Sequence, residues 1–163
     1  ARTERSLDEL DRMLVAAHHA NGSLPVRRSL ALDYRQQTAF RRSLAAEIAT
    51  TPVDRALVWM HGAVTTNGVL PLATMLGRQR EESPSDGPAE FWHVVGSAGG
   101  NLAALVGEYR EECEKIEGIT YRRIILGSIR EESRRRWLTH DEISAGVVGL
   151  VSEGEGGVIG GGE

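Results

Sequence analysis

Glu90 and His93 are the first residues of the chain whose types and spacing suggest chemistry. On a helix, this three-residue step places a carboxylate and an imidazole one turn apart. Helical bundles that bind two metal ions use two such Glu-x-x-His steps with further glutamates. Further carboxylates follow closely in the sequence at Glu108, Glu111 and Glu112. No second Glu-x-x-His step is present, so we favour a solvated acidic helix surface and predict neither a metal site nor a cofactor.

Other sequence motifs do not complete a catalytic set. The chain lacks a Gly-x-x-x-x-Gly-Lys phosphate loop, a Gly-x-Ser-x-Gly elbow and a His-Glu-x-x-His motif. Cys113 is the single cysteine and lies on an apolar helical stripe, which predicts a small core residue. A lone cysteine also forms no internal disulfide, so we expect a reducing compartment, the cytoplasm. We therefore expect a protein without catalytic activity.

Arginines form the most basic surface that the sequence predicts. Arg28, Arg35 and Arg42 are seven residues apart and would align on one side if residues 25–49 formed one continuous helix, with Arg27 and Arg41 beside them. Phosphate contacts from such a surface make nucleic-acid binding strongly dependent on salt. These arginines lack an aromatic platform and a recognised groove-reading motif. Nucleic-acid binding is therefore an alternative function and not the preferred one.

Charge is unevenly divided along the chain. Residues 1–80 carry eleven arginines against seven acids, and residues 81–163 carry eight basic residues against sixteen acids. We expect the two halves to attract each other. Lys115 is the only lysine, which indicates the codon usage of a high-GC genome, that of a bacterium or its phage. No apolar run reaches about 18 residues, so we expect no membrane partner.

Apolar residues recur at three- and four-residue intervals, which predicts an all-α fold, a compact bundle of about seven or eight helices. We expect residues 1–152 to form one helical domain with its best internal boundary at 78–88. The glycine-rich residues 153–163 should form a flexible tail. The predicted helices are 7–20, 25–32, 34–49, 53–66, 88–96, 101–117, 120–137 and a last helix capped by Thr139 and Glu142.

A short echo of sequence connects the first two thirds of the chain. Asn-Gly-x-Leu-Pro occurs at residues 21–25 and again at 67–71. The repeat indicates either a duplicated helical unit or the same stop and start signals at two helix boundaries, since glycine ends a helix and proline begins one.

Val58 and Trp59 lie outside the apolar stripe of the predicted helix 53–66. A helix that is apolar on two sides is either central in its domain or covered by another molecule. Tryptophan often anchors interfaces, so Val58 and Trp59 are our candidate interface residues. The preferred function is a non-catalytic helical interaction protein, a self-associating adaptor or assembly component of a high-GC bacterium or its phage. A nucleic-acid-binding accessory protein and a carboxylate–metal enzyme are the alternatives.

Overall fold

A computed structural model of the 163-residue chain describes residues 32–33, 35–60, 65–82, 87–96, 110–131 and 134–160. The chain divides into two compact units, Ala1–Ser43 and Leu44–Glu163. Helix α2 (Gln37–Thr50) begins in the first unit and confirms the helix predicted at 34–49. Asp33 precedes it and accepts a hydrogen bond from the Arg35 amide at 3.0 Å.

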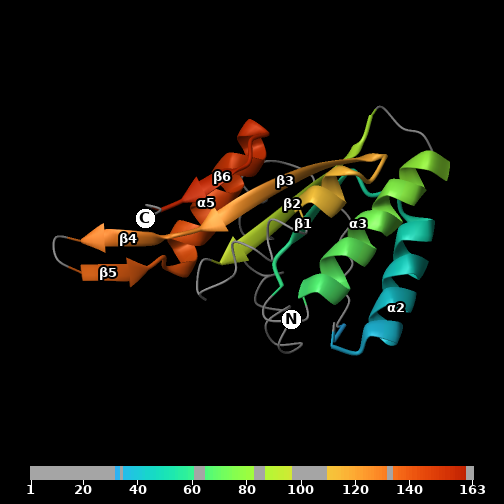
Figure 1. Cartoon of the computed structure of the whole chain (residues 1–163), viewed down its shortest axis with the longest axis horizontal. Coiled ribbons are helices and arrows are strands. Elements are labelled where there is room, and N and C mark those ends of the chain that lie inside the picture. Colours follow the sequence, from blue (N-terminus) through green and yellow to red (C-terminus); the bar gives the residue numbers. More distant parts are fainter. Residues whose placement is uncertain are drawn as a thin grey trace, which may run out of the picture. The chain divides into compact units, whose positions relative to one another are not determined.

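A parallel four-stranded sheet organises the second unit, in the order β1-β2-β3-β6 (Figure 1). A two-stranded antiparallel hairpin of β4 and β5 follows β3. Helices α3 and α5 pack against the parallel sheet. The chain is therefore an α/β protein, and the prediction of an all-α helical bundle is wrong. The elements are β1 (Arg55–Val58), α3 (Thr65–Glu82), β2 (Ala89–Gly96), β3 (Ile119–Leu126), β4 (Ser128–Glu131), β5 (Arg134–Trp137), α5 (His140–Glu153) and β6 (Gly157–Ile159).

The two faces of the sheet carry separate hydrophobic cores. Phe91 and Trp92 are neighbours in β2, both fully buried, and they point to opposite faces because strand side chains alternate. The face of Phe91, here the α3 face, packs Val58 and Phe91 against Leu76 of α3. The face of Trp92, here the α5 face, packs Trp92 and Ile124 against Val147 of α5. Cys113 is fully buried on the α3 face, which confirms its prediction as a core residue.

The β1–α3–β2 and β3–α5–β6 crossovers of the sheet have opposite hands. The connections β1–α3–β2 and β3–α5–β6 both step to the next strand in the same direction across the sheet. Nevertheless α3 and α5 cover opposite faces. Nearly all parallel crossovers are right-handed, so one of these two departs from the rule. The β4–β5 hairpin lies within the second connection, between β3 and α5.

Three predicted helices are strands in the structure. Residues 53–66 contain β1, residues 88–96 contain β2, and residues 120–137 contain most of β3 with β4 and β5. Parallel strands covered on both faces carry nearly continuous apolar runs, which resemble the pattern of a buried helix. The residue 67–71 copy of the Asn-Gly-x-Leu-Pro echo lies inside α3 and ends no helix, and the first copy lies outside the described residues.

The last predicted helix is present as α5, and residues 157–159 of the glycine-rich segment after it form a strand. Thr139 caps α5 through its hydroxyl, which accepts from the Glu142 amide at 3.3 Å, and the Glu142 carboxylate accepts from the Thr139 amide at 2.8 Å. Gly154 ends the helix with φ +75°. The chain then returns as β6, which pairs with β3 and packs the half-buried Ile159 against the core on the α5 face. None of the helices in the described ranges is long and apolar enough to cross a bilayer.

Candidate functional site

Strand β1 is an edge of the sheet, and its side chains alternate between core and surface. Val58 and Met60 pack into the core on the α3 face, so Arg55, Leu57 and Trp59 share the opposite side. Leu57 is 54% exposed and Trp59 is 41% exposed, whereas Val58 is 7% exposed. The strand thus separates the two residues predicted as an interface, because Val58 is a core residue. We call Arg55, Leu57 and Trp59 the β1 surface.

The backbone of β1 also presents hydrogen-bonding groups at this edge. The Glu90 amide of β2 donates to the Asp54 carbonyl at 2.8 Å. Alternate residues of a strand bond to the same neighbour, so Ala56 and Val58 continue the ladder to β2. The amide and carbonyl groups of Arg55 and Leu57 therefore point away from β2. Within the ranges that the structure describes, no strand pairs with this outer edge.

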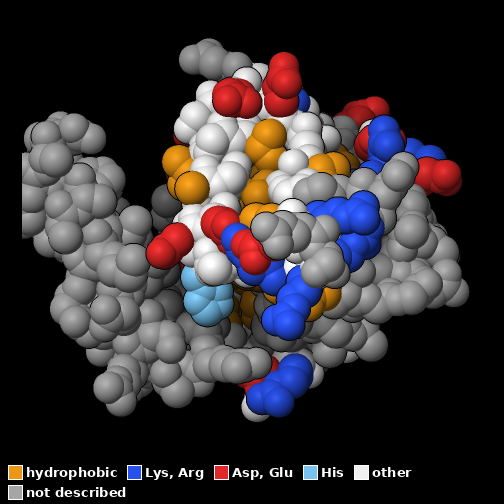
Figure 2. Space-filling view, turned by 90° about the vertical axis from the view of Figure 1, so that its left-hand side faces the viewer, with side chains coloured by type: hydrophobic (Ala, Val, Ile, Leu, Met, Phe, Trp, Pro, Cys, Tyr) orange, Lys and Arg blue, Asp and Glu red, His pale blue; other side chains and the backbone are white. Residues whose placement is uncertain are grey.

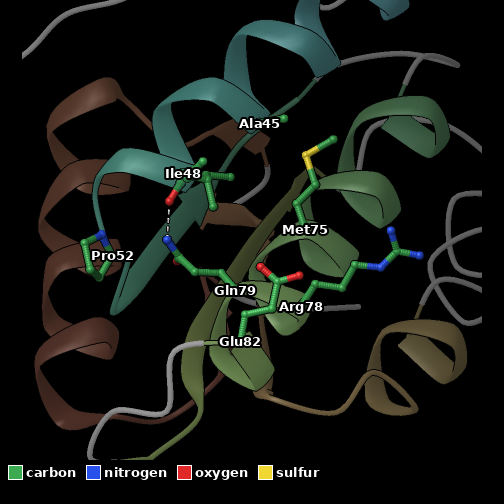
Figure 3. A pocket seen from close by; sticks show the side chains of 8 residues that line it. Ala45, Ile48, Pro52, Met75, Arg78, Gln79 and Glu82 are labelled. Atoms are coloured by element: carbon green, nitrogen blue, oxygen red, sulfur yellow. Dashed lines mark hydrogen bonds between the residues drawn. The ribbon is translucent and has the colours of Figure 1, made fainter.

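Side chains from the end of α3 hold the start of β1 in place. The Gln79 side chain accepts from the Val53 amide at 3.0 Å and donates to the Ile48 carbonyl (Figure 3). The buried Arg80 donates to the Val53 carbonyl at 3.1 Å and pairs with the Asp54 carboxylate. These contacts connect the loop before β1 to α3 and so fix the position of the first residues of β1.

Glu90 lies next to the β1 surface on the same face of the sheet. Its carboxylate accepts from Arg55 and lies 3.8 Å from Nε of Arg122. The Arg122 guanidinium carbon lies 5.4 Å from the centre of the Trp92 ring, a cation–π geometry. Two arginines thus neutralise Glu90, and the cluster carries a net positive charge beside Leu57.

His93 lies on the α3 face and is only 1% exposed. Its Nδ1 is hydrogen-bonded to the Tyr121 hydroxyl, 3.0 Å away. Burial lowers the pKa of His93 to about 4, assisted by the charge of Arg123, so the imidazole is neutral at pH 7. Burial likewise raises the pKa of the Cys113 thiol to about 11 and raises the pKa of Tyr121. These three side chains are therefore neutral members of the folded core.

The candidate metal ligands do not converge. Glu90 and His93 are three positions apart on a strand, which directs them to opposite faces of the sheet. Glu111 and Glu112 are exposed in the helical segment 110–114, and Glu108 lies outside the described residues. Among the residues whose placement is described, no three histidine, cysteine or acidic side chains come close enough to hold a metal ion.

The candidate nucleic-acid residues lie in the first unit. Arg41 and Arg42 are exposed on α2, and Arg35 forms an ion pair with Asp33 at 2.9 Å. Arg27 and Arg28 lie outside the described residues. Another group of arginines, which the sequence analysis assigned to a helix, gathers over the β4–β5 hairpin of the second unit (Figure 2). These are Arg130, Arg134, Arg135 and Arg136.

Sequence reasoning missed Leu57 as a surface residue and the hairpin as a basic ribbon. A helical reading of residues 53–66 turns Leu57 inward, whereas the two-residue period of Arg55, Leu57 and Trp59 turns it outward. This two-residue alternation was the sequence pattern from which β1 could have been predicted. For the hairpin, no turn sequence of the common two-residue type separates the strands, so the residue pattern gave little indication of a turn.

A shallow groove of ≈ 290 Å³ lies between the end of α2 and α3. Ala45, Ile48 and Met75 line it with apolar atoms, and Gln79 closes one wall through its bonds to the loop before β1 (Figure 3). The Gln79 amide is already used in holding that loop. Arg78 and Glu82 also line the groove, so it combines apolar walls with two charged side chains of α3.

Comparisons of the chain with protein-family models, with curated proteins and with solved structures found no match.

Proposed function

We propose that this protein is a non-catalytic interaction protein that self-associates through the β1 surface. The observation that carries the proposal is the exposure of Leu57 in an edge strand and of Trp59 directly after that strand. An edge strand offers unpaired backbone groups to another strand, and exposed apolar side chains beside it add buried area on contact. The residues best suited to chemistry, His93 and Cys113, are buried in the core, which also favours a binding role.

The β1 surface is complementary to itself under a two-fold axis at Leu57. In an antiparallel pair of β1 strands, directly opposed residues share a face, so Leu57 meets Leu57 of the second copy. The same register brings Arg55 of one copy to Trp59 of the other, where a guanidinium can lie over an indole ring. The outward amide and carbonyl of Leu57 exchange two hydrogen bonds with the same groups of the second copy. We therefore propose a second copy of this chain as the partner.

The expected complex is reversible. β1 contains four residues, and short edge strands limit pairing between sheets. From Arg55 to Trp59 the extended chain spans about 13 Å. We expect such a short contact to bury less than about 1,200 Å², the size of weak and transient complexes. The fraction of dimer should therefore rise with protein concentration.

Sedimentation velocity over a concentration series tests this function. The wild type should pass from monomer to dimer, and Leu57→Lys should stay monomeric because it opposes two positive charges at the axis. Val148→Lys is the matched control, since Val148 is 64% exposed on α5 and lies outside the β1 surface. A wild type that stays monomeric at every concentration contradicts the proposal, as does a Leu57→Lys variant that dimerises like the wild type.

We also propose the cytoplasm as the compartment, on the single cysteine. Cys113 is a free thiol buried in the core, which suits a reducing environment.

A further inference from the structure

The β4–β5 hairpin has two faces of different character. Residues opposite each other in an antiparallel pair share a face, so Arg130, Arg135 and Trp137 lie together with Ser128. We call this set the open face of the hairpin. Arg130 and Arg135 are exposed, and Trp137 is 56% exposed. The open face therefore combines two guanidinium groups with one accessible indole ring.

The other face of the hairpin is occupied by ion pairs with the protein itself. Arg136 donates to Glu131 at 2.6 Å and to both carboxylate oxygens of Glu142 at 2.7 and 2.8 Å. This contact raises the pKa of Arg136 and lowers that of Glu142 to about 2, so both stay charged across the physiological range. Because Glu142 also caps α5, the pair fixes the hairpin to the helix and turns the open face away from it.

The opposed positions of Arg130 and Arg135 bring no stability to the fold. They are directly opposite each other across the hairpin, and like charges in that position destabilise a strand pair. Among the described residues, no acidic side chain lies within ion-pair distance of either one, in contrast to Arg136. An anionic ligand seated between them would relieve this repulsion and form charge-assisted hydrogen bonds.

We propose that the open face binds single-stranded nucleic acid, with phosphates on Arg130 and Arg135 and a base stacked on Trp137. Trp137 follows Arg135 by two strand positions, about 7 Å, so one short segment of nucleic acid can reach both. Base stacking on an exposed indole requires an unstacked base, which a single strand offers and a duplex does not. Arg130, Arg134 and Arg135 are exposed, and Figure 2 shows Lys and Arg side chains gathered on the face that it draws. This surface is separate from the one proposed for self-association.

Fluorescence anisotropy with a labelled oligothymidylate of about 16 nucleotides tests the open face. The wild type should bind it at least tenfold more tightly than a labelled duplex of the same length. Trp137→Leu keeps apolar bulk in the hairpin but removes the ring, and should weaken binding about 5- to 150-fold, the range for one stacked base. Trp137→Phe keeps an aromatic face and should retain most of the affinity.

Salt dependence identifies the phosphate contacts. The slope of log K against log salt should fall in magnitude by about 0.7 for Arg130→Ala and again for Arg135→Ala. Arg134→Ala is the matched control, because it removes the same charge from the same hairpin but on the opposite face, and its slope should equal that of the wild type. No binding at low salt overturns the proposal. Equal affinity for duplex, equal loss in Trp137→Phe and Trp137→Leu, or equal slopes for Arg130→Ala and Arg134→Ala also overturn it.

Discussion

Acidification should destabilise this protein through His93. The pKa of His93 falls from its ordinary value of 6.5 to about 4 in the fold, because burial penalises the imidazolium. Below pH 6.5 the unfolded chain therefore takes up a proton that the folded chain refuses, and stability falls until the pH reaches about 4. A difference of about 2.5 between the two pKa values corresponds to about 3 kcal/mol at 1.36 kcal/mol per pKa unit.

Urea unfolding at several pH values between 7 and 4 measures this loss. Other carboxyl groups titrate at the lower end of this range, so the comparison is with His93→Gln, which keeps a polar side chain that does not titrate. The free energy of unfolding of the wild type should fall relative to the variant by about 3 kcal/mol. Parallel pH curves for the two proteins would refute the reasoning. Tyr121→Phe separates the effect of burial from that of the hydrogen bond to the Tyr121 hydroxyl. Because burial is the main cause of the shift, the pKa of His93 should stay well below 6.5 in this variant.

Two further predictions follow from the glycines and from the two proposed surfaces. Gly118→Ala should destabilise the fold by more than about 1 kcal/mol in urea unfolding, because Gly118 has φ +77° and an added Cβ would lie 2.7 Å from the Gly77 carbonyl oxygen. Gly149→Ala in α5 meets nothing within 4 Å and should stabilise by about 1 kcal/mol, so equal effects of the two changes would contradict the described turn. If both proposed surfaces act, a dimer carries two hairpins, and a long oligonucleotide should bind the wild type tighter than Leu57→Lys while a short one binds both alike. Anisotropy with both lengths measures the difference, and an equal length effect in the two proteins argues against joint action.

Helix α5 was predictable because the signals that define it are local. Thr139 and Glu142 are three residues apart and bond to each other's backbone within one turn, which needs no other part of the chain. Gly154 ends the helix by adopting a left-handed conformation that favours glycine. Helix α2 was also predictable, because its apolar residues recur at helical spacing, and two of them, Phe40 and Ile48, are buried in the structure.

Strands β2 and β3 were not predictable from periodicity alone. In β2, a run from Phe91 to Val95 is buried on both faces, so its pattern shows no alternation and fits a short buried helix equally well. In β3, Ile124 and Ile125 are β-branched and favour a strand, but their spacing from Tyr121 also fits one side of a helix. Which element forms is decided by neighbouring strands far away in the sequence, and that information is not in the local pattern.

The candidate site shows the same division between local and distant causes. Leu57 has an apolar side chain that a helical pattern turns inward, and only the pairing of β1 with β2 leaves it on the outer face of an edge. Glu142 could be identified from the sequence as a capping residue, yet its second contact, with Arg136, exists only because the hairpin folds back toward α5. A local rule thus gave the correct role for Glu142 and half of its contacts. The contact of Glu142 with Arg136 holds one face of the β4–β5 hairpin against α5, and strand alternation places Arg130 and Arg135 on the opposite, open face. The positions of these three arginines therefore depend on strand pairing, which the spacing of residues in the sequence does not reveal.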